Sequence, residues 1–137
     1  MEYLLDTNMV TALMEENTKF LEHLQNLSEN DSVMTTVFTY GEIYYGINIL
    51  PQCKKRKRLE QKANQAFSDL LILSADARVA TYYFKIKSDL KKKGRPFNAE
   101  NDLWIAATAL ANQMCLVTDD AHFKEVDDLQ IEDWIKD

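Results

Sequence analysis

The sequence predicts an α/β fold with a small, mostly parallel β-sheet flanked by helices. Short apolar runs of strand length alternate with longer segments whose apolar residues recur at helical spacing, which is typical of successive βαβ units. The chain has 137 residues and 46% of them are hydrophobic, so it is long enough to bury a core of its own. We therefore expect a single domain over residues 1–137.

Five apolar runs are expected to form the strands. In chain order they are Tyr3–Leu5, Val33–Thr35, Leu71–Leu73, Leu116–Thr118 and a weaker run at Leu129–Ile131. Parallel neighbours cannot be joined by a tight turn and need a longer crossover connection, which is usually a helix. The spacing between these runs leaves room for such helices.

Six segments are expected to be helical: Thr7–Glu15, Lys19–Leu27, Val37–Leu50, Gln52–Asp69, Asp76–Lys93 and about Asn101–Asn112. The fifth has the clearest pattern, because Val79, Tyr83, Ile86 and Leu90 recur at helical spacing. The last puts Leu103, Ala107, Leu110 and Ala111 on one face.

Several helix ends are marked by residues suited to them. Pro51 stops the third helix, because proline cannot continue it. Ser74 is the expected N-cap of the fifth helix, and Gly94 is its expected C-cap, followed by Pro96.

The composition excludes several classes of function. With 16 basic and 22 acidic residues the net charge is −6, which argues against nucleic-acid binding by overall positive charge, so any such contact must be local. The three glycines are Gly41, Gly46 and Gly94, and neither GxGxxG nor GxxxxGK[ST] occurs. The backbone cradle that nucleotide-binding folds use for phosphate is therefore missing, and phosphate binding requires a metal ion.

The cysteines and the hydropathy pattern indicate a soluble, cytoplasmic protein. Cys53 and Cys115 are far apart, form no CxxC motif and follow no secretory leader, which favours a reducing compartment. The longest strongly apolar stretch, Leu103–Ala111, is far shorter than the about 20 residues that a membrane span needs. No membrane association is expected.

Acidic residues occur where a parallel fold brings them together. Asp6 follows the first strand directly, and Asp119 and Asp120 follow the fourth, so they lie at the carboxyl edge of the sheet, where such folds bind ligands. Helices of these folds begin at the same edge, which places Asp102 in a first turn and Glu42 within the first two turns of its helix. The sequence predicts four carboxylates around one crevice.

Four converging carboxylates indicate a site for Mg²⁺ or Mn²⁺. Like charges at this range destabilise one another, and a divalent cation removes that repulsion. A metal-bound water of lowered pKa can then attack phosphorus without a histidine. Structural roles remain open beside this one: Asp6 can be an N-cap, and Asp102 can interact with the helix dipole.

The same acids lie in motifs that resemble those of PIN-domain ribonucleases and, more narrowly, VapC-like toxins of bacterial toxin–antitoxin pairs. The resemblance covers essentially the whole chain, with the motifs in the family's order and spacing. These motifs, each with its acid, are LLDTN (Asp6), TYGEIYYG (Glu42), GRP followed by DLWIAA (Asp102) and TDDAHF (Asp120).

The resemblance implies a PIN-like nuclease domain that cleaves phosphodiester bonds of RNA, either tRNA or mRNA, with Mg²⁺ or Mn²⁺ as cofactor. It also implies a homodimer neutralised by an antitoxin protein. The implied catalytic and metal-binding residues are Asp6, Glu42, Asp102 and Asp120. The adjacent Asp119 leaves the fourth ligand open, although Asp120 occupies the family's [DN] place.

Three other functions stay open. A PIN-like RNA-processing nuclease needs no antitoxin, and a metal-free interaction module needs no acidic site. A phosphatase with an aspartyl nucleophile has a second aspartate as general acid–base, where this chain has Asn8, which cannot transfer the proton.

Some further residues have several possible roles. The basic segments Lys54–Arg58 and Lys91–Lys93, with Arg95, can follow an RNA backbone or form solvated helix faces. For Tyr40, Tyr44 and Tyr45, around Glu42, a core or dimer contact is favoured over stacking on bases. His23 and His122 are expected at the surface or in packing rather than as ligands. Gly41 is unusual inside a helix, where it costs about 1 kcal/mol relative to alanine.

Overall fold

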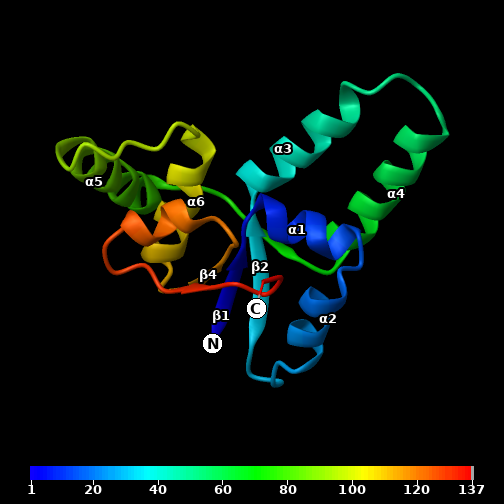
Figure 1. Cartoon of the computed structure of the whole chain (residues 1–137), viewed down its shortest axis with the longest axis horizontal. Coiled ribbons are helices and arrows are strands. Elements are labelled where there is room, and N and C mark those ends of the chain that lie inside the picture. Colours follow the sequence, from blue (N-terminus) through cyan, green and yellow to red (C-terminus); the bar gives the residue numbers. More distant parts are fainter. Residues whose placement is uncertain (137) are drawn as a thin grey trace.

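A five-stranded parallel sheet lies at the centre of the structure, a computed structural model that describes residues 1–136 (Figure 1). Its strands are β1 (Glu2–Leu5), β2 (Ser32–Thr36), β3 (Leu71–Leu73), β4 (Cys115–Val117) and β5 (Ile131–Glu132). The predicted α/β fold with a parallel sheet is confirmed. The last strand shares only Ile131 with the predicted run, and Asp137, at the end of the predicted domain, lies outside the described residues.

The predicted helices are all present, with small shifts at their ends. They are α1 (Thr7–Met14), α2 (Thr18–Gln25), α3 (Val37–Asn48), α4 (Lys54–Ser68), α5 (Ala77–Lys92) and α6 (Glu100–Ala111). A short 3-10 helix, η1 (Ala121–Glu125), follows β4 and was not predicted. No helix of residues 1–136 is long and apolar enough to cross a membrane.

The strand order is β3-β2-β1-β4-β5, so the chain begins in the middle of its own sheet. It first builds outward through β2 and β3, and later returns to place β4 and β5 on the other side of β1. Leu5 pairs with Val117, at the carboxyl ends of β1 and β4. The order therefore reverses between these two strands, and a crevice forms there in folds of this kind.

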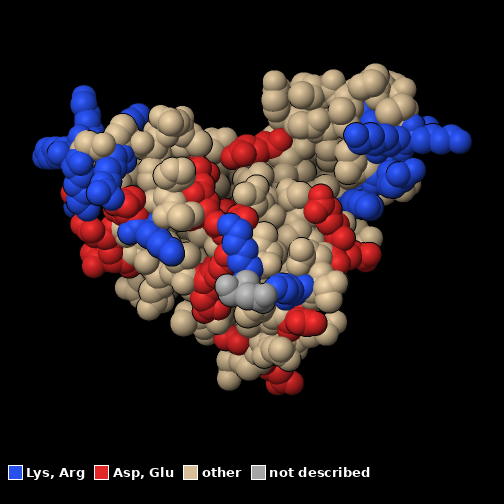
Figure 2. Space-filling model, viewed as in Figure 1, with Lys and Arg blue, Asp and Glu red and all other residues tan. Residues whose placement is uncertain are grey.

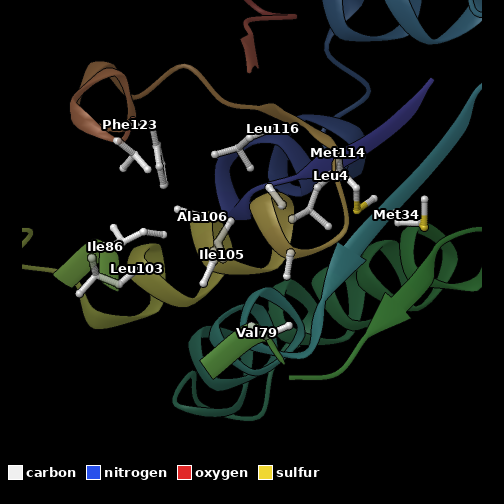
Figure 3. Close-up of a cluster of buried hydrophobic side chains, with 14 of the residues drawn as sticks. Leu4, Met34, Val79, Ile86, Leu103, Ile105, Ala106, Met114, Leu116 and Phe123 are labelled. Atoms are coloured by element: carbon white, nitrogen blue, oxygen red, sulfur yellow. The ribbon is translucent and has the colours of Figure 1, made fainter. Parts of the chain in front are cut away.

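Alternating side chains of the strands enter two cores on opposite faces of the sheet. Leu4 and Leu116 belong to the core under α5 and α6, while Leu5 and Val117 belong to the core under α1 to α4. Figure 3 shows Leu4 and Leu116 beside residues of α6, including Ile105. Because both faces are covered, the central strands β1 and β4 are almost completely buried and leave function to the edge of the sheet.

The central helix α6 is buried on more than the one face that was predicted. Leu103, Ile105 and the alanines that follow have almost no exposed surface, whereas Leu110 is only partly buried. Because most of its surface is buried, packing fixes the position of this helix and of its first turn.

The two ends of α5 tested the predicted caps. The prediction of Ser74 as N-cap is wrong: Asp76 is the N-cap, and its Oδ1 accepts a 3.0 Å hydrogen bond from the N–H of Val79. Gly94 stops the helix as predicted, one residue beyond the C-cap, with a φ of +72°. The N–H of Arg95 donates to the carbonyl of Leu90 over 2.9 Å, as in a Schellman motif.

Candidate active site

A cleft of about 440 Å³ opens where the strand order reverses. The four predicted acids all line it, from the position after β1, from α3, from α6 and from the segment after β4. Its lining residues are Asp6, Thr7, Asn8, Glu42, Ala99, Glu100, Asn101, Asp102 and Asp120. Figure 2 shows acidic side chains in the hollow between the two halves of the molecule, and large groups of Lys and Arg at its outer flanks.

Asp6 is the most enclosed of these acids, with 4% of its surface exposed. It caps α1, since its Oδ1 accepts a 2.9 Å hydrogen bond from the N–H of Met9. Its Oδ2 accepts a 2.5 Å hydrogen bond from the hydroxyl of Thr118. The N-cap role considered for Asp6 is therefore real, and the same side chain also faces the cleft.

The environment of Asp6 disfavours its charged form. Burial raises its pKa from 3.8 to about 7, against the opposing effect of the hydrogen bonds from Thr118 and Met9, and the charges of Asp119 and Asp102 raise it further. A buried carboxylate next to other carboxylates is stabilised by a proton or by a cation.

Asp102 lies in the first turn of α6, as predicted, and is about half buried. Burial raises its pKa to about 6, with further increases from the charges of Asp120 and Glu42 and a smaller opposing effect of His122. Carboxylates from three separate elements thus act on one another. The helix-dipole role remains compatible with this position, because a negative charge is favourable in a first turn.

The structure separates the two adjacent acids after β4. Asp120 lines the cleft, while Asp119 does not. The Oδ1 of Asp119 accepts a 3.2 Å hydrogen bond from the amide of Asn8, and its Oδ2 lies 3.8 Å from the ammonium of Lys136. Asp119 therefore has structural partners of its own.

Asp120 is held by its own backbone segment. Its Oδ1 accepts a 2.9 Å hydrogen bond from the N–H of His122 and lies 2.8 Å from Nδ1 of the same residue. The N–H of Asp120 donates to the hydroxyl of Thr118 over 3.0 Å. His122 is at the surface, as predicted, and His23 packs flat against Trp134 with ring centroids 5.8 Å apart.

Two further threonines, Thr7 and Thr39, connect two of the motifs. Besides Thr118, the hydroxyls of Thr7 and Thr39 lie 3.2 Å apart and connect the segment after β1 to the start of α3. Both are motif residues, although the motifs alone gave them no role. Asn101 also lines the cleft and was not predicted; its place next to Asp102 was the only signal.

The donor set matches a hard divalent cation, because carboxylate oxygens are the ligands that Mg²⁺ and Mn²⁺ prefer. Among residues 1–136, however, no group of three or more His, Cys, Asp or Glu side chains is arranged to hold a metal ion. The charges of these acids act on one another, and a divalent cation would neutralise that repulsion. The residues therefore fit the ion by chemistry and by placement on one cleft.

Tyr40 and Tyr45 are exposed, which contradicts a core role for them; the dimer contact, the other half of the favoured prediction, stays a prediction. Tyr45 is 68% exposed and Tyr40 is 42% exposed, while Tyr44 packs against Phe67 of α4.

The start of α4 is also exposed, except for Arg56, which donates hydrogen bonds to the carbonyl of Leu50 and the carboxylate of Glu60.

The family model described as PIN domain matches residues 3–129. A ribonuclease named VapC1 from Haemophilus influenzae is 32% identical over 142 aligned residues, which cover 99% of this chain and 100% of the relative. A ribonuclease named VapC2 from Rickettsia felis is 30% identical, with coverage of 99% and 100%.

Solved structures agree with this similarity. The VapBC2 complex of Rickettsia felis bound to a DNA fragment from their promoter contains a chain that matches with a TM-score of 0.87 and 28% identity, over 98% of this chain and 99% of that chain. The VapBC-1 complex of nontypeable Haemophilus influenzae matches with a TM-score of 0.87 and 30% identity, over 99% and 100%.

Proposed function

This chain belongs to the PIN-domain family, and on that premise we propose that it is an endoribonuclease that acts as the toxin of a bacterial type II toxin–antitoxin pair. The observation that carries the proposal is the cleft at the carboxyl ends of β1 and β4, which acids from four separate motifs line together. Relatives that align over their full length are named ribonucleases. Residues 1–137 form one PIN-like nuclease domain in this proposal.

The proposed ligands of a divalent cation, Mg²⁺ or Mn²⁺, are Asp6, Glu42, Asp102 and Asp120. When bound, the cation supplies a water of lowered pKa for attack on phosphorus and neutralises charge on the phosphodiester. The protein holds the acids in place: Thr118 fixes the side chain of Asp6, and the buried helix α6 fixes the first turn that carries Asp102. The raised pKa values of Asp6 and Asp102 support this role, since a cation relieves the same repulsion as a proton.

The proposed partners are an RNA substrate, tRNA or mRNA, and a cognate antitoxin protein. The matched structures are toxin–antitoxin complexes, which supports the second partner. A homodimer is also proposed, and the exposed neighbours Tyr82 and Phe84 on α5 offer apolar surface for a protein contact. Free thiols at Cys53 and Cys115 agree with a reducing cytoplasm.

RNA cleavage with purified protein tests the proposal. Wild-type protein cleaves RNA with Mg²⁺ or Mn²⁺ and stops when EDTA is added, whereas Asp102→Asn is inactive under both conditions. The matched control is Asp89→Asn, which removes a carboxylate from α5 outside the cleft and keeps wild-type activity. Cleavage by Asp102→Asn at the wild-type rate contradicts the assignment of the cleft.

A further inference from the structure

Gly41 has no structural reason within the described chain to be a glycine. It lies inside α3, where glycine weakens a helix, and its φ is not positive. A Cβ built at this position meets no heavy atom within 4 Å. Neither backbone conformation nor close packing requires the missing side chain, and its absence leaves open space beside Glu42.

Two hollows meet at this open space. The first, here called the α3 hollow, has a volume of about 350 Å³ and is lined by Val37, Phe38, Gly41, Glu42, Tyr45 and Asn101. The second, the α3–α4 hollow, has a volume of about 450 Å³ and lies between these two helices.

The α3 hollow shares Glu42 and Asn101 with the acidic cleft, and it shares Gly41 and Tyr45 with the α3–α4 hollow. The three cavities therefore lie in a row. Gly41 lines both of the last two, so a larger side chain at this position would intrude where they meet.

The walls of this row suit unpaired nucleobases. Tyr45 is 68% exposed and offers an aromatic face next to the acidic cleft. In the α3–α4 hollow, Asn64 accepts a 2.5 Å hydrogen bond from Tyr44, and Asn48 accepts one of 2.9 Å from Arg56. Within residues 1–136 the amide nitrogens of both asparagines have no acceptor, so they are free to donate to base edges.

Basic residues lie where the row ends. Lys57 is exposed and lies on the same face of α4 as Glu60, one turn further on, and Asn64, two turns further on. The Glu60 carboxylate in this hollow is already paired with Arg56, 3.0 Å away. The basic run Lys54–Arg58 lies on the flank seen in Figure 2, so phosphates repelled by the acidic cleft meet positive charge here.

We propose that the row of cavities from the acidic cleft over Gly41 to the start of α4 binds the single-stranded RNA segment next to the cleaved bond, with one base stacked on Tyr45. The inference rests on the proposed ribonuclease function and adds the path of the substrate. Stacking on an exposed ring needs bases that are not paired, which is why the segment is single-stranded. It also gives Gly41 its reason, since the strand crosses α3 where a side chain is missing.

Binding of a fluorescein-labelled single-stranded RNA of mixed sequence tests the path, measured by anisotropy in the non-cleaving Asp102→Asn background. Gly41→Leu raises the Kd at least tenfold, because the side chain fills the junction. Gly46→Leu is the matched control: it is also a helical glycine of α3 with open space around its Cβ, and it lines none of the three cavities. It leaves the Kd unchanged, and equal melting temperatures of the two variants show that folding is intact.

Three further substitutions, at two residues, test the contacts. Tyr45→Ala weakens binding by about tenfold, as expected for one lost stacked base, whereas Tyr45→Phe keeps the ring and binds within about twofold of wild type. Lys57→Glu reduces the slope of log Kd against log salt, because one phosphate contact is lost. RNA annealed to its complement binds more weakly than the single strand and does not respond to Tyr45→Ala.

The outcomes separate this inference from the function on which it rests. If wild-type protein cleaves RNA but Gly41→Leu binds and cleaves as Gly46→Leu does, the path is wrong and the ribonuclease stands. If wild-type protein neither binds nor cleaves RNA, both fall. If Gly41→Leu changes only the molar mass seen by light scattering and not RNA binding, the surface is a contact between copies and the path is overturned.

Discussion

The hydroxyl of Thr118 donates a 2.5 Å hydrogen bond to Oδ2 of Asp6, although the two residues are 112 positions apart in the chain. The hydroxyl oxygen of Thr118 in turn accepts a hydrogen bond from the N–H of Asp120. One side chain thus ties the acid after β1 to the acid after β4. It also opposes the rise in the pKa of Asp6 that burial causes.

Thr118→Val is expected to lower both stability and activity. The substitution keeps the shape but removes the hydrogen-bond partner of Oδ2 of the buried Asp6 and that of the N–H of Asp120, at a cost of about 1–3 kcal/mol. Denaturant unfolding and RNA cleavage measure the two effects. Thr118→Ser, which keeps the hydroxyl, restores most of both, and a Thr118→Val protein with wild-type activity shows that the link has no role in the site.

Asp6→Asn is expected to abolish cleavage and to stabilise the metal-free protein at neutral pH. Because the folded pKa of Asp6 is raised from 3.8 to about 7, the folded state holds a proton that the unfolded state has lost, and stability falls as pH rises through this window. An asparagine side chain does not titrate, so its contribution to stability does not fall with pH. The free energy of unfolding of Asp6→Asn therefore exceeds that of the wild type by on the order of a few kcal/mol at pH 7 and by little near pH 4.

Denaturant unfolding in EDTA at several pH values measures this difference. Asp89→Asn, outside the cleft, serves as the control and keeps the pH profile of the wild type. A gap between Asp6→Asn and wild type that does not change with pH rules out the titration of Asp6 as its cause.

Mn²⁺ is expected to raise the melting temperature of the wild type, because it binds the folded state and not the unfolded chain. At about ten times its Kd the shift amounts to about 3–6 °C. Glu42→Gln reduces the shift to less than half. Glu100→Gln is the sharper control, since Glu100 also lines the cleft but is paired with Lys87. Calorimetry measures the melting temperatures of all three proteins with and without Mn²⁺. An unchanged wild-type melting temperature favours the metal-free interaction module.

Asp120→Asn is expected to lower metal-dependent cleavage at least a hundredfold, and Asp119→Asn no more than fivefold. The reason is that Asp120 lines the cleft, whereas Asp119 is held outside it by Asn8 and Lys136. Rates measured at saturating Mn²⁺ compare the two variants. The opposite order identifies Asp119 as the ligand and leaves the other three acids in place.

The sequence was sufficient for the order of elements and for the position of the acids relative to the sheet. Apolar runs and helical spacing are local signals, and the reversal of strand order places Asp6 and Asp120 together once β1 and β4 are neighbours. The motif favoured Asp120 over Asp119 as the fourth ligand, and this choice stays a prediction; the different surroundings of the two acids required the structure, because they depend on partners such as Lys136 that lie elsewhere in the chain.

The wrong N-cap has the same origin. Ser74 and Asp76 are both good N-cap residues, and only the backbone shows which one directly precedes the first helical turn. The sequence left a core role and a dimer contact open for Tyr40 and Tyr45, because their burial depends on where α4 packs against α3, which no local pattern reports. The sequence showed that Gly41 is unusual inside a helix, but it did not show which residues surround it.

The central position of β1 makes assembly of the cleft depend on a segment that is synthesised much later. β1 is made before the other strands, yet its neighbour β4 and the fourth acid come from residues 115–120. Until that segment emerges, one edge of β1 has no partner and Asp6 lacks the hydroxyl of Thr118. A chain that stops before residue 115 therefore cannot assemble the cleft, because both β4 and Asp120 are missing from it.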